Sequence, residues 1–362
     1  MRSIKENASP FVQQPVVAMP PAISVEKTKE LYHPSTIAKM CSNENPFGVS
    51  PKALAAMEAE LPKLCFYADP EPENALKAKV AERLGVQPCN VMITAGAAFA
   101  LNFIGEVFIQ KGDEAIVCSP TYPPYYSIIR KSCGTVVDVP MTKDCKFDFD
   151  GLLKAITDKT KVIFLCNPNN PTGCTVTREV FSAFVRQVRP DIIVVSDEAY
   201  VQYAKDPAAV TMVPALKEFP NLVVIQTFSK LYGMAAIRVG YAVASQEIIS
   251  FLQRMSIARA LNAAGIQGAI AALDDVEFAE MTVRNNADGR DYLTSEFQKL
   301  GFKVYPSESN FVYVDMKEDP KKIVEKLLPY GIVLRANFPL MRISIGTREQ
   351  NERLVLAIRK TL

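Results

Sequence analysis

A lysine with hydroxyl-bearing neighbours follows an apolar run of the chain. One residue, Gln226, separates Leu222-Val223-Val224-Ile225 from Thr227-Phe228-Ser229-Lys230. Arg238 stands eight residues beyond the lysine. Such a run indicates a buried strand, so Lys230 is expected just past a strand end. The amine there could form a Schiff base with an aldehyde cofactor, while Thr227, Ser229 and Arg238 could hold its phosphate. The alternative is a surface lysine after a core strand, with an arginine that opens the next one.

An aspartate ends a second apolar run. Ile192-Ile193-Val194-Val195 is followed by Ser196 and then by Asp197-Glu198-Ala199-Tyr200. A carboxylate at the end of so apolar a strand is costly unless it is paired. A protonated pyridine nitrogen would be such a partner, and Tyr200 could reach the phenolic oxygen of the same ring. A simple helix-capping aspartate is the alternative.

Three more strand ends carry unusual loops. Small residues at Gly96-Ala97-Ala98 precede a helix, whose N-terminus offers free N–H groups to a phosphate. Tyr122, in the proline-rich segment 120–126, could stack on a flat ring. Asn170, in Asn-Pro-Asn-Asn-Pro-Thr-Gly at 167–173, could offer its amide to a ligand oxygen. A tight turn and packing within a loop are the alternatives for the first two segments. The glycine-rich motifs of dinucleotide-binding and P-loop proteins do not occur, so those interpretations lose their main support.

The elements that would position these residues are strands alternating with helices. Short β-rich runs at 91–95, 115–119, 135–139, 162–166, 192–196, 222–227 and 239–244 predict a seven-stranded sheet, largely buried on both faces. The predicted class is α/β, a mostly parallel sheet sandwiched by helices, with a smaller α+β domain. We expect an N-terminal arm at 1–45, a large domain at 46–250 and a small domain at 251–362 that includes part of the arm. In open α/β sheets, ligands gather at the carboxyl ends of the strands, where the residues above lie.

Composition narrows the classes of function. The 362 residues carry a formal net charge of +2 with the signs interspersed, so we expect no nucleic-acid or membrane partner. No run approaches the length of a membrane span, and prolines interrupt the only candidate leader segment. Eight scattered cysteines without C-x-x-C spacing favour a reducing cytoplasm over a disulfide or zinc framework. The single histidine, His33, excludes a multi-histidine metal centre, and we expect no metal. Proton transfer therefore falls to lysine, tyrosine or a carboxylate.

Taken together, these motifs resemble those of fold-type-I pyridoxal-phosphate aminotransferases, and most closely the histidinol-phosphate aminotransferase branch. Other segments of the chain extend the likeness to residues 42–362: Ser-Asn-Glu-Asn-Pro-Phe-Gly at 42–48, Tyr-Ala-Asp-Pro at 67–70, Gly-Ile-Val-Leu-Arg at 331–335 and Arg-Ile-Ser-Ile-Gly-Thr at 342–347. Two departures concern the phosphate loop and the substrate. Ala98-Phe99 stands where the branch usually has an acidic pair, and Ala235-Ala236-Ile237 replaces the usual Ala-Gly-Leu.

The resemblance implies a role for each matching residue. Lys230 would hold pyridoxal 5'-phosphate as an aldimine, Asp197 would pair with the ring nitrogen, and Asn170 and Tyr200 would contact the ring oxygen while Tyr122 stacks on the ring. The phosphate would be held by the amides of Ala97 and Ala98, by Thr227, Ser229 and Arg238, and by Tyr67 from a second subunit of a homodimer. On the substrate side, Arg342 would clamp the α-carboxylate in a bidentate fork, Arg335 would meet a distal phosphate, and Asn45 would lie at the substrate.

The resemblance also implies a reaction. We expect an amino group to move from an amino acid or a histidinol-phosphate-like donor to a 2-oxo acid, 2-oxoglutarate, by ping-pong kinetics through the Lys230 aldimine. Transamination of an aromatic amino acid remains an alternative, as does a decarboxylase resembling threonine-phosphate decarboxylase. A non-catalytic pyridoxal-binding regulator is disfavoured because no helix-turn-helix segment or basic patch is attached.

Overall fold

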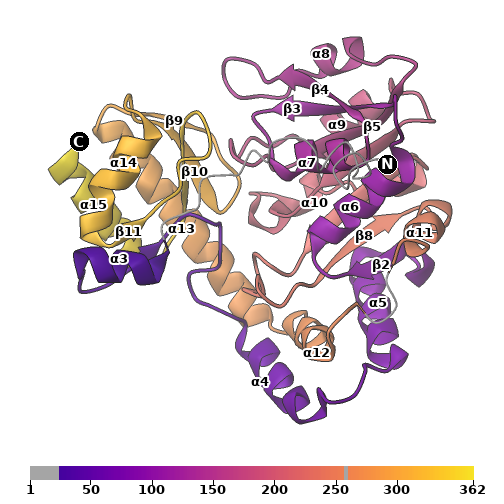
Figure 1. The fold of residues 1–362 in the computed structure, drawn as a ribbon, viewed down its shortest axis with the longest axis horizontal. Coiled ribbons are helices and arrows are strands. Elements are labelled where there is room, and N and C mark those ends of the chain that lie inside the picture. The colour runs from indigo at the N-terminus through magenta and orange to yellow at the C-terminus, as the bar shows by residue number, and fades with distance from the viewer. Residues whose placement is uncertain (1–23, 257–259) are drawn as a thin grey trace, which may run out of the picture.

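A seven-stranded sheet forms the centre of the larger part of the molecule (Figure 1). The computed structural model describes residues 24–256 and 260–362. The strands lie in the order β2-β8-β7-β6-β5-β3-β4, and β8 is the one strand of this sheet that runs opposite to the other six. This arrangement confirms the predicted α/β class with a mostly parallel sheet. The bounds are β2 Val91–Thr94, β3 Glu114–Ser119, β4 Thr135–Pro140, β5 Thr160–Cys166, β6 Ile193–Asp197, β7 Leu222–Thr227 and β8 Gly240–Ala244.

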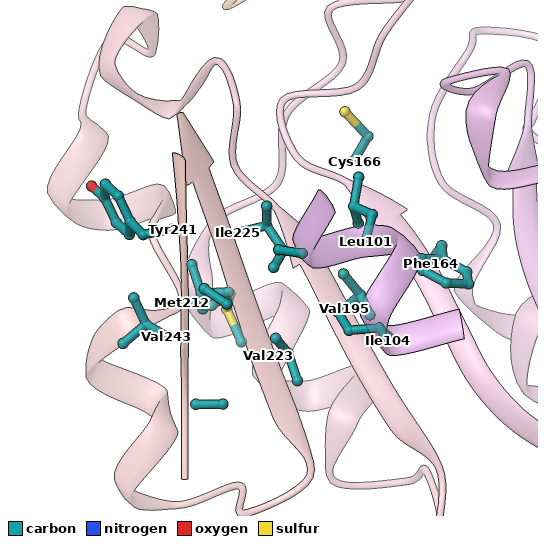
Figure 2. Close-up of a cluster of buried hydrophobic side chains, with 14 of the residues drawn as sticks. Leu101, Ile104, Phe164, Cys166, Val195, Met212, Val223, Ile225, Tyr241 and Val243 are labelled. Carbon is teal, nitrogen blue, oxygen red and sulfur yellow. The ribbon is translucent and has the colours of Figure 1, made fainter. Parts of the chain in front are cut away.

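Helices cover this sheet and complete a large core. Every residue of β2, β6, β7 and β8 is buried, which explains why these strands read as continuous apolar runs. Figure 2 shows Leu101 and Ile104 of α6 lying over side chains of β5, β6 and β7. The helices of this part are α4 Pro51–Glu60, α5 Pro70–Leu84, α6 Ala97–Phe108, α7 Pro124–Lys131, α8 Phe149–Lys154, α9 Arg178–Val185, α10 Pro207–Val210, α11 Gln246–Gln253 and α12 Ala263–Ala272.

A second, smaller core is built from the C-terminal residues and one N-terminal segment. Its centre is a three-stranded antiparallel sheet in the order β12-β10-β9, and a two-stranded parallel pair, β1 with β11, lies beside it. Ala38 and Met40, from the N-terminal segment, pack in this core. The elements are α3 Val25–Tyr32, β1 Ala38–Lys39, α13 Val276–Lys299, β9 Lys303–Tyr305, β10 Phe311–Asp315, α14 Pro320–Leu327, β11 Ile332–Val333, β12 Met341–Ser344 and α15 Arg348–Thr361. The domain bounds at 45 and 250 stay a prediction.

One long helix belongs to both cores. Residues near the start of α13, Ala279 and Val283, pack against the large core, whereas Leu293 and Phe297 near its end lie in the small core. In Figure 1, α13 runs from the neighbourhood of α12 to the small core. The two parts are therefore joined by a continuous helix of 24 residues.

Two helices differ from the predictions. The segment predicted only as an arm contains a helix, α3, whose first turn is capped by Ser24, which accepts from Lys27 N (3.0 Å). The segment 120–126 was expected to be a loop, but α7 begins there at Pro124, since proline fits the first turn of a helix. The part of the arm at residues 1–23 lies outside the described residues. Within the described ranges, no helix combines the length and apolar composition needed to cross a membrane.

Candidate active site

Ten of the predicted site residues line one cavity at the carboxyl ends of the large sheet. The cavity has a volume of about 140 Å³. Strands β5, β6 and β7 deliver their terminal residues to it, because parallel strands end at the same edge of a sheet. The ten residues are Ala97, Ala98, Tyr122, Asn170, Asp197, Tyr200, Thr227, Ser229, Lys230 and Arg238.

Asp197 ends β6 as a buried carboxylate with neutral partners. Its Oδ2 accepts from the Tyr125 hydroxyl (2.7 Å), and its Oδ1 accepts from Ala199 N (3.2 Å). Burial raises the pKa of Asp197 to about 6, and these two bonds and the charge of Lys230 oppose that rise. A cation on the open side of this carboxylate would favour its charged form further.

Tyr125 is a member of the site that our sequence interpretation did not single out. Its ring lies stacked on Phe164 (centroids 5.1 Å apart, planes at 19°) and meets Tyr122 edge to face (5.4 Å, 82°). Burial and the neighbouring Asp197 carboxylate raise the pKa of the Tyr125 hydroxyl well above its usual value. The hydroxyl therefore stays protonated and donates a hydrogen bond to Asp197. The signal for this role is the pair of prolines before Tyr125, because proline favours the first turn of a helix and α7 begins at Pro124.

Glu198 lies beside Asp197 in sequence but has a separate set of partners. Its carboxylate accepts from Met212 N (2.6 Å), Thr211 Oγ1 (2.7 Å), Gln226 Nε2 (2.9 Å) and Ser196 Oγ (3.2 Å). Burial raises the pKa of Glu198 to about 7, against these four donors. Because Gln226 precedes Thr227 on β7, this carboxylate ties the strand that carries Asp197 to the strand that leads to Lys230.

Lys230 follows β7 and presents its amine to the cavity. Its Nζ donates to the carbonyl oxygen of Ser42 (3.1 Å) and lies 5.9 Å from the centre of the Tyr200 ring. Burial lowers the pKa of Lys230 to about 8; the charges of Arg342 and Arg238 add to that effect, whereas Glu44 and Asp197 oppose it. A lysine with such a pKa is partly neutral at mildly alkaline pH and can act as a nucleophile.

An anion-binding cradle lies at the N-terminus of α6. Gly96 has φ +90°, and a Cβ at this position would collide with the guanidinium of Arg238. Arg238 Nη1 donates to Ala235 O (2.7 Å) and lies 3.4 Å from Ser229 Oγ. The amides of Ala97 and Ala98 are among the first of the helix, which have no partner inside it. Helix N–H groups, a hydroxyl and a guanidinium therefore converge on one point, as binding of a phosphate requires.

A buried network joins the small core to the cavity. Tyr200 OH accepts from Asn170 Nδ2 (3.2 Å) and from Asn43 Nδ2 (3.1 Å). Arg342, on β12, donates through Nη1 to Asn170 Oδ1 and through Nη2 to Cys41 O, both at 2.7 Å. Its Nε atom is buried without a hydrogen-bond partner, and burial lowers the pKa of its guanidinium. Our sequence interpretation gave Asn43 no role of its own.

Four predicted residues do not line the cavity: Arg342, which is connected to it through Asn170, and the three described next. Tyr67 is 75% exposed and follows η1 (Leu61–Lys63) on the surface. Arg335 lines a neighbouring pocket, described below. Asn45 donates through Nδ2 to Leu231 O (2.7 Å) and Thr282 Oγ1 (3.3 Å) and accepts from Phe47 N (3.0 Å). The structure thus gives Asn45 a place in the framework, and its predicted substrate contact stays a prediction.

Comparison with known proteins shows which family this chain resembles. Residues 35–358 match the family model described as aminotransferase class I and II. A histidinol-phosphate aminotransferase of Brevibacillus brevis is 37% identical over 345 residues, which cover 94% of each chain. The crystal structure of a histidinol-phosphate aminotransferase from Sinorhizobium meliloti in complex with pyridoxal-5'-phosphate is 27% identical, with a TM-score of 0.88 over 98% of this chain and 97% of that one.

A relative with another substrate name shares the same fold. A double mutant of the Thermus thermophilus aspartate aminotransferase matches with a TM-score of 0.84 and 25% identity, over the full length of both chains. The predicted recognition of a fold-type-I pyridoxal-phosphate aminotransferase is thereby confirmed. The chain belongs to the aminotransferase class I and II family.

Proposed function

We propose that this enzyme is a pyridoxal 5'-phosphate-dependent aminotransferase that moves an amino group from a donor such as histidinol phosphate to 2-oxoglutarate, by ping-pong kinetics. The principal support is that Lys230 and Asp197 line one buried cavity together with a cradle for a phosphate. The choice of donor is supported by the histidinol-phosphate aminotransferases among the relatives.

The cavity fits pyridoxal phosphate at three points. Asp197 has only neutral hydrogen-bond donors, and a protonated pyridine nitrogen would supply the opposite charge. The amides at the start of α6 and Arg238 would receive the phosphate, and a side chain at Gly96 would displace the Arg238 guanidinium. Lys230 has an amine with a pKa of about 8, which suits attack on an aldehyde.

The chain's own groups divide the remaining tasks. When bound, pyridoxal phosphate supplies an electron-withdrawing ring that acidifies the substrate Cα–H. Lys230 Nζ, once neutral, takes the proton from that Cα and holds it until it is returned. Asp197 would hold a proton on the ring nitrogen, and Tyr122, which lines the same cavity, would cover the ring and exclude water. Arg342 exchanges its bonds to Asn170 and Cys41 for a bidentate contact with the carboxylate of the oxo acid.

A second copy of the chain would complete the site. The segment 61–67 exposes four large apolar side chains: Leu61, Leu64, Phe66 (76% exposed) and Tyr67 (75% exposed). Clustered exposed apolar surface often marks a protein interface. We propose a homodimer that covers this segment, in which Tyr67 of one copy reaches the phosphate in the other. Copies with Lys230→Ala and copies with Tyr67→Ala, mixed under conditions of subunit exchange, should recover activity, because one site of each mixed dimer is then intact. No recovery would contradict the shared site.

The donor is tested with a panel of amino compounds. Histidinol phosphate, phenylalanine and tyrosine are each incubated with 2-oxoglutarate and the holoenzyme, and glutamate and carbon dioxide are measured. We expect glutamate with histidinol phosphate at a kcat/KM at least about tenfold above that with the aromatic amino acids, a difference of about 1.4 kcal/mol. A preference for phenylalanine or tyrosine would instead favour the aromatic aminotransferase. Carbon dioxide without glutamate would indicate a decarboxylase, and cofactor binding without either product would contradict catalysis.

A further inference from the structure

A second pocket adjoins the cavity on the side of the small core. It has a volume of about 310 Å³ and lies between the start of α3 and the parallel pair of β1 with β11. Two cationic side chains line it, together with the carboxylate of Glu26 on α3. The lining residues are Ser24, Val25, Glu26, Lys39, Cys41, Ser42, Val333 and Arg335.

The strand register brings the two cations to the same pocket. Lys39 pairs with Val333 across the parallel ladder. Side chains alternate between the faces of a strand, so Lys39 and Cys41 share one side, as do Val333 and Arg335 on the neighbouring segment. All four of these residues line the pocket.

The inner wall of this pocket is also a wall of the candidate active site. Ser42 O accepts from Lys230 Nζ (3.1 Å), and Cys41 O accepts from Arg342 Nη2 (2.7 Å). A ligand that occupied the pocket would therefore lie directly behind the segment that holds the catalytic lysine and the substrate-binding arginine.

The two cations are compensated unequally. Lys39 Nζ is bonded to Glu44 Oε1 (2.7 Å), and both side chains are substantially exposed, at 45% and 37%. Exposed ion pairs of this kind contribute little to stability, so Lys39 can change partner at small cost. Arg335 Nε, in contrast, is buried without a hydrogen-bond partner. The positive charge of Arg335 also contributes to the lowered pKa of Arg342, which an anion between the two arginines would relieve.

We propose that Lys39 is a specificity-determining residue, which binds the doubly charged phosphate at the distal end of the donor together with Arg335. Glu44 holds the lysine in position and releases it when the phosphate enters. A phosphate has several acceptor oxygens, so it can accept hydrogen bonds from the ammonium of Lys39 and from the unpartnered Nε of Arg335 at the same time. This inference rests on the proposed transfer from a phosphorylated amino donor.

The test compares histidinol phosphate with histidinol, which lacks the phosphate. Both are titrated against the wild-type holoenzyme and a Lys39→Ala variant, and KM and kcat are measured with 2-oxoglutarate at saturation. We expect Lys39→Ala to reduce the ratio of the KM for histidinol to the KM for histidinol phosphate at least about tenfold. The change in kcat should be much smaller, because the variant loses substrate binding and not chemistry. Lys39→Arg, which keeps the charge, should restore most of that preference.

Two additions make the test decisive. Lys326→Ala is the matched control, because Lys326 also bonds a glutamate, Glu318 (2.8 Å), on the small core but away from the pocket; it should change neither KM. Calorimetric binding of the two donors to a Lys230→Ala background, with and without Lys39→Ala, gives a measurement that needs no turnover. If Lys39→Ala weakens the binding of histidinol phosphate but not of histidinol, the inference is supported. That holds even if the wild type transfers no amino group, a result that would contradict only the proposed function. An equal loss for both donors, or no loss, overturns the inference.

Discussion

The ring side of the site and the distal pocket are built in opposite ways. Around Asp197, the hydrogen-bond donors are neutral, fixed in place and buried beneath helices and strands of the large core. In the distal pocket, Lys39 is held by an exposed, exchangeable ion pair with Glu44, and the buried Nε of Arg335 lacks a hydrogen-bond partner. The supporting strands differ too: β6 has five residues within a seven-stranded sheet, whereas β1 and β11 have two each.

This difference separates two functions. Chemistry that every substrate shares needs groups whose positions do not change, and a buried sheet edge provides them. Recognition of one particular substrate needs groups that can leave their partners when a ligand arrives. We therefore expect substitutions on the ring side to affect all donors alike, and substitutions in the distal pocket to affect donors according to their distal charge.

The largest expected effect is that of Lys230→Ala. Without the amine at the end of β7, turnover with every donor should fall by roughly a thousandfold or more, which corresponds to about 4 kcal/mol in the barrier. The visible absorbance of lysine-bound pyridoxal phosphate should disappear in the same variant. Lys230→Arg keeps the charge but not the nucleophile and should be equally inactive. If either activity or the absorbance persisted, Lys230 would not be the catalytic lysine.

The next effect concerns Asp197→Ala, which removes the carboxylate opposite the proposed ring nitrogen. We expect a loss on the order of 3–5 kcal/mol in cofactor binding and catalysis combined, because a buried positive charge would then lack its partner. Asp197→Asn keeps the size of the side chain and the hydrogen bond from Tyr125, so comparing it with Asp197→Ala separates the effect of the lost charge from the effect of lost packing. Cofactor affinity and rate within tenfold of wild type in Asp197→Ala would show that the assigned role is wrong.

A smaller loss is expected for Tyr125→Phe. The ring would still stack on Phe164, while the hydrogen bond to Asp197 disappears. Hydrogen bonds to charged groups contribute roughly 1.5–3 kcal/mol, so we expect cofactor affinity to fall about ten- to a hundredfold. Tyr126→Phe is the matched control, because the neighbouring hydroxyl bonds Asp138 (2.8 Å) on the protein surface. Equal affinities in the two variants would contradict a role for Tyr125 on the ring side.

The smallest effect is a pH dependence. With a pKa of about 8 for Lys230, the rate at which the cofactor-free protein captures pyridoxal phosphate should rise about tenfold from pH 7 to pH 9 and then level off. A lysine of ordinary pKa would give a rise that continues above pH 9. Because the folded state loses this proton at a lower pH than the unfolded state does, the contribution of Lys230 to stability should increase between pH 8 and 10.5, the ordinary pKa of a lysine.

The same contrast decides what could be predicted from the sequence. The ring side was accessible because buried parallel strands read as apolar runs, and their ends mark the ligand edge. Tyr125 escapes the sequence-based prediction because Pro-Pro-Tyr-Tyr suggests a loop, whereas Pro123 caps α7 and Pro124 is its first residue. Asn43 was missed because it meets Tyr200 from 157 residues away, a contact that no local pattern specifies. The Lys39 pocket depends likewise on the long-range pairing of β1 with β11.

The continuity of α13 affects how the protein unfolds. A helix whose two ends are packed in different cores transmits the loss of one core to the other, since its hydrogen-bonded turns lose their support from that end. We therefore expect one cooperative denaturant transition for both cores, followed equally by probes near Tyr292 and near Tyr241. Two separate transitions would mean that α13 unfolds in two parts, and that each part of the helix folds with the core against which it packs.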